Sequence, residues 1–117
     1  MINVALIYLV LVLIGQAAPG SLRELLGNPD RFYEQPVIIS GTVSNVRESG
    51  WRRPLYTFDL SDGTQTVRVI AFGKPACRSG AATVEGTFGR MRASYEYEIT
   101  ARSVICLPDS VDPRGPN

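Results

Sequence analysis

The stretch Tyr56–Phe72, YTFDLSDGTQTVRVIAF, decides the fold of this chain. Apolar and aromatic side chains occupy every second position from Tyr56 to Leu60, which is typical of a half-buried β-strand. Asp62 and Gly63 follow, and glycine tolerates the positive φ that a two-residue hairpin turn needs. We therefore predict two antiparallel strands joined by a tight turn.

The residues around this hairpin predict three further strands. In the return strand Val67, Val69 and Ala71 continue one face. The other strands are expected at about 37–46, 83–91 and 95–106, where β-branched residues alternate and glycines interrupt. Gly41, inside the first strand, predicts a bulge or a sharp bend. Five short strands in one stretch favour a small closed barrel over an open sheet.

The remaining sequence divides the chain into four parts. Residues 1–17 form an apolar segment, 18–36 a short helix with a connector, 37–107 the barrel, and 108–117 a proline-containing tail. Ser21 and Glu24 have the spacing of a capping box and predict the start of the helix. The Gly-Asn-Pro sequence at 27–29 predicts its end.

The apolar N-terminal segment has three possible roles. It runs unbroken from Val4 to Ile14, and small residues at Gly15 and Ala17 are typical of an export signal cleaved after Ala17. A retained membrane anchor is the second role. The third is a strand buried against a neighbouring subunit, because the segment is apolar on both parities. One face of that strand would carry Val4, Leu6, Tyr8, Val10, Val12 and Ile14.

Composition excludes several classes of chemistry. The chain has 12 Lys and Arg against 11 Asp and Glu, so no excess of positive charge marks it as a nucleic-acid binder. It has no His, which removes Ser-His-Asp and Cys-His catalysis and His-based zinc or haem sites. We therefore expect a protein that is not an enzyme and has no cofactor, with Ca²⁺ as the one ion to consider.

The strand order and the glycine bends resemble the OB-fold, and in particular bacterial OB-fold domains of the nucleic-acid-binding, anticodon-binding-like type. The segments that carry the resemblance are 40–43 (SGTV), 56–64 (YTFDLSDGT), 67–73 (VRVIAFG), 84–86 (VEG) and 99–104 (ITARSV). The resemblance implies an all-β, five-stranded Greek-key barrel whose ligand stays open, because OB-folds bind many kinds of partner. A short exported OB-fold is also similar to the haem chaperone of cytochrome c maturation, but the absence of His argues against that function.

In an exported chain the two cysteines are expected to pair. The OB-fold implies that the third and fifth strands are parallel neighbours, so Cys77 and Cys106 would emerge at the same end of the barrel. We predict a Cys77–Cys106 disulfide and an extracytoplasmic location.

The ligand face that the OB-fold implies consists of the second and third strands with two flanking loops. The aromatic and arginine residues expected there are Trp51, Arg52, Arg53, Tyr56, Arg68, Arg90 and Arg92. Aromatic rings stack on bases or sugars, and arginines pair with phosphates. The alternative for Tyr56 is a place in the core, because it shares parity with Phe58 and Leu60.

Asp59 and Asp62 lie close together at the hairpin turn and offer oxygen ligands for Ca²⁺. The alternative for Asp62 is a simple role in forming the turn before Gly63.

Two functions remain open. The first, slightly favoured, is a structural subunit that assembles with copies of itself through the N-terminal strand into an extracellular filament. The second is an extracytoplasmic module that binds single-stranded nucleic acid or an oligosaccharide. A membrane partner applies only if the N-terminal segment is a retained anchor.

Overall fold

The computed structural model describes residues 20–91 and 96–108 of the chain. Two short helices, α2 (Leu22–Gly27) and α3 (Pro29–Phe32), precede the strands β1 (Pro36–Ser49), β2 (Leu55–Ser61), β3 (Thr66–Phe72), β4 (Gly80–Arg90) and β5 (Tyr97–Cys106). The predicted all-β architecture with five strands is confirmed.

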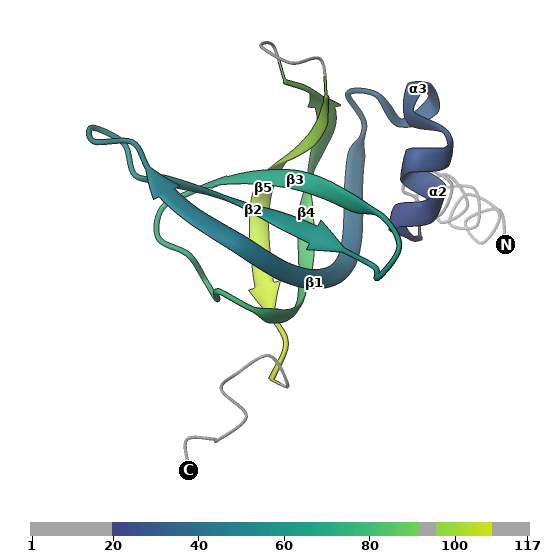
Figure 1. The fold of residues 1–117 in the computed structure, drawn as a ribbon. Coiled ribbons are helices and arrows are strands. Elements are labelled where there is room, and N and C mark those ends of the chain that lie inside the picture. The colour runs from purple at the N-terminus through teal and green to yellow at the C-terminus, as the bar shows by residue number, and fades with distance from the viewer. Residues whose placement is uncertain (1–19, 92–95, 109–117) are drawn as a thin grey trace, which may run out of the picture.

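The strands close into a barrel in the order β1-β2-β3-β5-β4 (Figure 1). Neighbouring strands are antiparallel except β3 and β5, which run parallel from Arg68 opposite Glu98 to Ile70 opposite Thr100. This order and the single parallel seam are those of the OB-fold that the sequence resembles. The predicted barrel class is therefore confirmed.

The core lies inside the barrel and is built by the alternation seen in the sequence. Every second residue of β2 and β3 is buried, and Phe58 and Phe88 are the largest fully buried side chains. Tyr56 stacks on Phe58, with ring centroids 5.8 Å apart. Burial of each such side chain stabilises the fold by about 1.5–3 kcal/mol.

Bends in β1 and β4 allow the five strands to close into a barrel. In β1 the register shifts between Ser44 and Arg47, and Asn45 adopts a positive φ of 54°. In β4 the register with β5 shifts between Glu85 and Gly86. A Cβ atom on Gly86 would lie 2.2 Å from the Thr100 carbonyl oxygen, so glycine lets the two backbones approach each other here.

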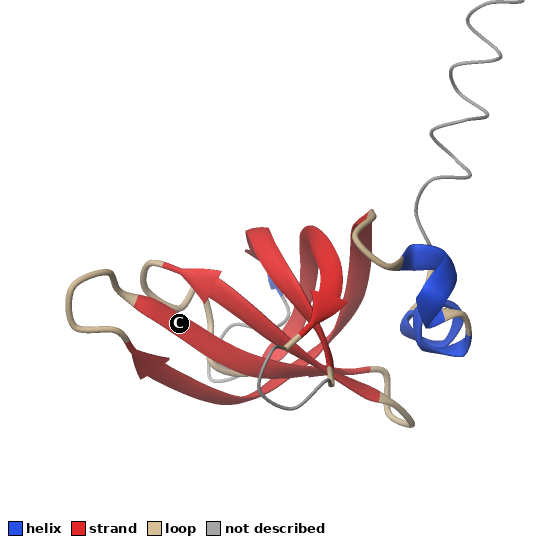
Figure 2. Ribbon diagram, turned by 90° about the horizontal axis from the view of Figure 1, so that it is seen from above, coloured by secondary structure: helices blue, strands red, loops and turns tan. Residues whose placement is uncertain are grey.

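The helices pack against the side of the barrel on which the β2–β3 turn lies (Figures 1 and 2). As predicted, the Ser21 side chain accepts a hydrogen bond from the Glu24 backbone N–H, and α2 ends at Gly27. Leu22 and Leu25 are buried in the core. The Glu24 carboxylate bonds the backbone of the residue before the cap, so the capping box extends one position outward.

Two sequence predictions were wrong in detail. The connector contains a second helix, α3, because Pro29 begins a helical turn at a position where its missing N–H is not needed. The β2–β3 loop has four residues, 62–65, rather than two, since Ser61 pairs with Thr66. Gly63 does have the expected positive φ, of 100°.

Strand bounds also differ from the expected ones. β1 begins at Pro36 and continues to Ser49, β4 begins at Gly80, and β5 begins at Tyr97.

Candidate ligand-binding surface

The most exposed aromatic side chain of the described structure lies in the loop between β1 and β2. Trp51 is 86% exposed, and Phe72, at the end of β3, is 52% exposed. Arginines lie over both rings: the Arg52 Cζ atom is 4.7 Å from the Trp51 ring centroid, and the Arg53 Cζ atom is 5.5 Å from that of Phe72. We call Trp51, Arg52, Arg53 and Phe72 the aromatic–arginine tip.

Backbone constraints hold the tip together. Gly50 has a φ of 86°, and a Cβ atom on it would lie 2.3 Å from the Arg53 carbonyl oxygen, so the loop turns tightly. The backbone N–H of Gly73 donates to the Pro54 carbonyl at 2.9 Å. Leu55 pairs with Phe72 in the β2–β3 ladder. The loop is therefore fixed against the end of β3, which brings the two aromatic residues of the tip to one side of the barrel.

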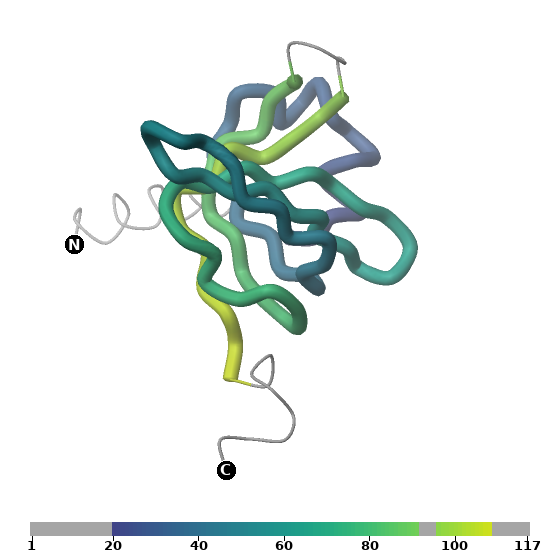
Figure 3. The backbone as a smooth tube through the Cα atoms, turned by 60° about the vertical axis from the view of Figure 1, so that its left-hand side comes forward, coloured from purple at the N-terminus to yellow at the C-terminus, as the bar shows by residue number. Residues whose placement is uncertain are grey.

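The surroundings of the tip are basic. The β3–β4 loop, 73–79, leaves the barrel on the same side as the β1–β2 loop (Figures 1 and 3). The basic residues of these two segments, including the last residues of β1, are Arg47, Arg52, Arg53, Lys74 and Arg78, against the single acidic residue Glu48. Arg78 forms an ion pair with Glu48. Although the whole chain is nearly neutral, its positive charge is concentrated here.

A disulfide anchors the β3–β4 loop. Cys77 and Cys106 are bonded, with their Cα atoms 6.2 Å apart, which confirms the predicted pairing. The geometric reason also holds, because β3 and β5 are parallel neighbours. The loop beside the tip is therefore tied covalently to the end of the last strand.

Tyr56, predicted to bind ligand, is a core residue. Its side chain is 3% exposed, so the alternative that placed it with Phe58 and Leu60 is correct. Burial raises the pKa of the Tyr56 hydroxyl, and a hydrogen bond with the Ala76 backbone opposes that rise. Tyr56 therefore links the barrel core to the β3–β4 loop through its hydrogen bond with the Ala76 backbone.

Arg68 lies among carboxylates on the outer face of β2, β3 and β5. It stands opposite Asp59 on β2 and opposite Glu98 on β5, and its Nε atom is 3.8 Å from Asp59 Oδ1. Partial burial raises the pKa of the Glu98 carboxyl, and the Arg68 charge counteracts this. Asn45 Nδ2 also donates to Asp59, at 2.8 Å.

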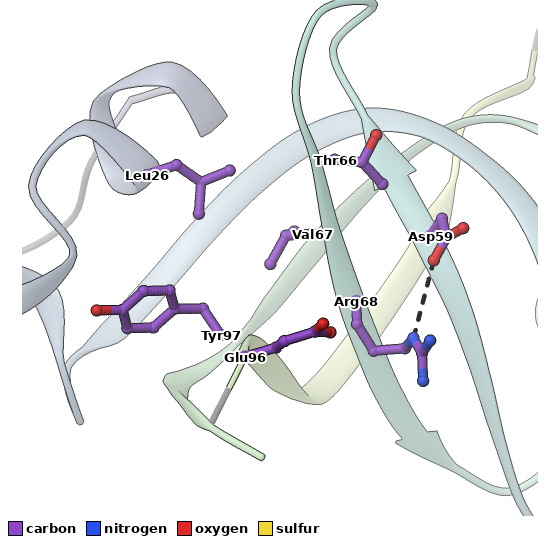
Figure 4. Close-up of a pocket in the computed structure, with 7 residues that line it drawn as sticks. All are labelled: Leu26, Asp59, Thr66, Val67, Arg68, Glu96 and Tyr97. Carbon is purple, nitrogen blue, oxygen red and sulfur yellow. Dashed lines mark ion pairs between the residues drawn. The ribbon is translucent and has the colours of Figure 1, made fainter. Parts of the chain in front are cut away.

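A hollow of about 500 Å³ lies on this face, next to α2 (Figure 4). Its lining residues are Leu26, Asp59, Thr66, Val67, Arg68, Glu96 and Tyr97. Figure 4 shows Leu26 and Tyr97 on one side and the Asp59–Arg68 pair on the other, with Glu96 between. The carboxylates of Asp59 and Glu96, which line the hollow, would repel a phosphate. This part of the expected face is therefore poorly suited to a nucleic-acid backbone.

Arg90 lies apart from the tip, near the helices. It donates to the Tyr97 hydroxyl at 2.9 Å, and this bond raises the pKa of Arg90. Its Cζ atom is 5.0 Å from the Tyr97 ring centroid and 6.0 Å from that of Tyr33. Arg92, also predicted to bind ligand, lies outside the described residues.

The two aspartates proposed for Ca²⁺ are engaged by the protein. Asp62 Oδ1 accepts from the backbone N–H groups of Thr64 and Gln65, both at 2.8 Å, and from the Thr64 hydroxyl. These bonds, that to Gln65 first, lower the pKa of Asp62. Within residues 20–91 and 96–108, no three His, Cys, Asp or Glu side chains gather to hold a metal. Asp62 thus has the turn-forming role considered as its alternative.

The residues predicted for assembly, Val4, Leu6, Tyr8, Val10, Val12 and Ile14, lie outside the described part of the chain. Across the described ranges, 20–91 and 96–108, no helix is long and apolar enough to cross a bilayer.

Sequence reasoning did not select Phe72 for the ligand surface. The parity of β3 carried the signal: Val67, Val69 and Ala71 are buried, so Phe72 falls outside the core-facing set.

The structure is similar to solved OB-fold domains of larger proteins. One is RecG bound to a three-way DNA junction, with a TM-score of 0.57, 21% identity, and coverage of 74% of this chain and 12% of that chain. Another is a protein assigned as an aspartyl-tRNA synthetase from Leishmania major Friedlin, with a TM-score of 0.56, 17% identity, and coverage of 69% and 19%. No family model and no curated protein matches the chain. The chain spans less than a fifth of either protein, and these likenesses show an OB-like fold.

Proposed function

We propose that this chain is an exported, non-enzymatic OB-fold module that binds single-stranded nucleic acid through the aromatic–arginine tip. The observation that carries the proposal is the 86% exposure of Trp51 on a fixed loop, with the Arg52 guanidinium over its ring. A large aromatic ring gains little by facing water in this way, whereas a base stacked on it would cover the ring. Base–aromatic stacking contributes about 1–3 kcal/mol per base.

The charges around the tip support the same ligand. Arg52 and Arg53 extend next to the two aromatic rings, where they can pair with the phosphates on either side of a stacked base. Lys74 is exposed on the neighbouring β3–β4 loop, whereas Arg47 lines a small pocket together with Asp59 and Arg68. The Asp59–Arg68–Glu98 face offers no such excess of positive charge, so the tip is the better phosphate site.

The similar structures give secondary support. RecG is described as bound to a DNA junction, and the second protein is described as an aminoacyl-tRNA synthetase. Both contain a domain of this fold, and we carry nucleic-acid binding over to this chain as part of the proposal.

Two features support export. The Cys77–Cys106 disulfide is typical of oxidising compartments. The apolar run from Val4 to Ile14, followed by small residues, is typical of a signal peptide.

The test is a titration of fluorescently labelled (dT)₁₂ with the chain from Ala18 onward, followed by anisotropy at 50 and 200 mM salt. Replacing Arg52 and Arg53 together by Ala should weaken binding by at least tenfold and reduce the salt dependence. The matched control replaces Arg23 and Arg31, two exposed arginines of the helices, and should bind as the wild type does. Equal loss in both double variants would contradict a site at the tip.

The same titration distinguishes single-stranded nucleic acid from an oligosaccharide, which is the alternative ligand of the tip. A neutral oligosaccharide that binds the tip would be displaced by excess unlabelled oligosaccharide and not by salt. Binding of an oligosaccharide without binding of (dT)₁₂ would assign the tip to sugars.

Self-assembly is the second candidate function, and one surface favours it. On the outer face of β1, β4 and β5, Ile38 and Ile105 are 51% and 59% exposed. Ser40 and Thr83 lie on the same face, with their hydroxyls 2.8 Å apart. Glu85, opposite Ile38, is neutralised by an ion pair with Arg102. Electron microscopy of the secreted protein, with intact mass, tests it: filaments whose subunits retain residues 4–14 would support assembly, and monomers that begin at Ala18 would exclude it.

A further inference from the structure

We propose that the crevice between the diverging ends of β3 and β5 is a subsite for a single nucleobase of a strand held at the tip. This inference rests on the proposed function and goes beyond it, because it assigns a second, deeper contact. The crevice measures about 250 Å³, and its lining residues are Tyr56, Ala71, Phe72, Ala101, Arg102, Ser103 and Val104.

The topology of the barrel creates the crevice. The parallel pairing of β3 with β5 ends where Ile70 stands opposite Thr100. Beyond that point Ala71 and Phe72 continue in the ladder with β2, whereas β5 continues in its ladder with β4. The register shift between Glu85 and Gly86 falls in this part of the β4–β5 ladder. The two strands therefore diverge beside the tip.

The walls of the crevice differ in chemistry. Phe72 forms an aromatic wall, and the buried Tyr56 lines the crevice together with the small side chains of Ala71 and Ala101. The half-buried Ser103 supplies a hydroxyl to the lining, and Arg102, which also lines the crevice, forms an ion pair with Glu85. A crevice lined by an aromatic ring, small side chains and a hydroxyl suits a flat ring with hydrogen-bonding edges.

Size and position select a base as the occupant. Drug-sized ligands occupy clefts of about 300–1,000 Å³, so this crevice accepts a smaller group. Phe72 belongs both to the crevice and to the tip, and Arg53 lies over its ring with Cζ 5.5 Å from the centroid. A strand whose phosphate pairs with Arg53 can therefore place an adjacent base in the crevice without leaving the tip.

The experiment compares two strands and two variants. The strands are (dT)₁₂ and an abasic strand of the same length and charge, each titrated by anisotropy. Ser103→Leu fills the crevice. Thr100→Leu is the control, because Thr100 lies on the same strand, is exposed and does not line the crevice. Thermal unfolding of each variant verifies that it is folded.

We expect Ser103→Leu to bind (dT)₁₂ about tenfold more weakly than the wild type, within the range for one stacked base. Its affinity for the abasic strand should be unchanged, and Thr100→Leu should match the wild type with both strands. If Ser103→Leu binds (dT)₁₂ as the wild type does, the subsite is refuted while the tip stands. If the wild type binds neither strand, the proposed function and the subsite fail together.

A second measurement decides the matter if Ser103→Leu does not fold. Amide NMR shifts of the wild type, titrated with (dT)₁₂ and then with the abasic strand, should include Ala71, Ala101 and Ser103 only for the base-containing strand. Equal shifts of these amides with both strands would refute the subsite.

Discussion

Replacement of Gly86 by Ala tests the account of how the barrel closes. The added Cβ atom would lie 2.2 Å from the Thr100 carbonyl oxygen and 2.8 Å from Ala101 Cα, both backbone atoms of β5. Non-bonded heavy atoms are most stable at about 3.5–4.0 Å, so the β4–β5 ladder must open by about 1 Å or more. Overpacking of this kind costs about 1–3 kcal/mol, and the rigidity of a backbone neighbour places Gly86→Ala at the upper end.

The same strand offers a matched control. Gly89 also lies in β4, and a Cβ atom on it would meet nothing within 4 Å. Gly89→Ala should leave stability unchanged or raise it by about 0.4–1 kcal/mol, because alanine restricts the unfolded chain. The two variants thus make the same chemical change in two different environments.

Urea unfolding and thermal unfolding, each followed by circular dichroism, measure both variants. We expect Gly86→Ala to lose about 3 kcal/mol relative to Gly89→Ala, with a fall in Tm of about 12–24 °C for a domain of this size. If the two variants unfold within about 0.5 kcal/mol of each other, the close approach of β4 and β5 at Gly86 does not limit the structure. The explanation of the bend would then be wrong.

Three further predictions concern the disulfide, the β2–β3 turn and the buried tyrosine. Replacing Cys77 and Cys106 together by Ser should destabilise the fold by about 3–4 kcal/mol, since the bond closes a loop with a sequence separation of 29; urea midpoints would show it, and an unchanged midpoint would contradict it. Hydrogen bonds in the turn lower the pKa of Asp62 below the ordinary 3.8. The ionised carboxylate therefore stabilises the folded state fully above the pKa of the unfolded chain, and this contribution is lost as the pH falls through the pKa of the folded chain. Thermal melts from pH 6 to 2 should therefore fall less steeply for Asp62→Ala than for the wild type, and parallel curves would refute the turn's dependence on the charge. Tyr56→Phe should cost about 1 kcal/mol because it removes the hydrogen bond with the Ala76 backbone, and amide hydrogen exchange in the β3–β4 loop should become faster.

Most of the barrel could be predicted because it depends on local alternation. From Tyr56 to Phe72 the period of two identifies both strands and their buried face, and the structure confirms it. The Cys77–Cys106 pair followed from the parallel seam that the OB-fold implies. Predicting these features requires the strand pattern and the order of the strands, and it requires no knowledge of how individual side chains pack.

The connector and the turn could not be predicted because single side chains decide them. Pro29 was interpreted as a helix end, but the same residue begins α3 since it sits at the first helical position. The four-residue turn depends on Asp62, whose carboxylate bonds two backbone N–H groups in the loop. Composition shows that a turn is present and does not show its length.

The candidate site was predictable only in part. Loops have no period, so the sequence does not show whether Trp51 is exposed, and in the structure the fixed geometry of Gly50 and Pro54 holds it in solvent. Arg68 was predicted as a ligand residue, but cross-strand register places it between two carboxylates. The missing information was the register between β3 and β5, which pair in the barrel although they are far apart in the sequence.

The position of β1 has a consequence for how the chain folds. Thr42 and Val43 pair with β2 on one edge and with β4 on the other, so β1 takes part in two seams at once. The β1–β2 seam joins near neighbours in the chain, whereas the β1–β4 seam joins Pro36 to Thr87 across the hairpin between them. Non-local pairings of this kind slow folding because loop closure must precede the contacts that reward it. The rate-limiting event should therefore be the late docking of β4 and β5 onto a preformed β1–β2–β3 meander, in a single cooperative phase.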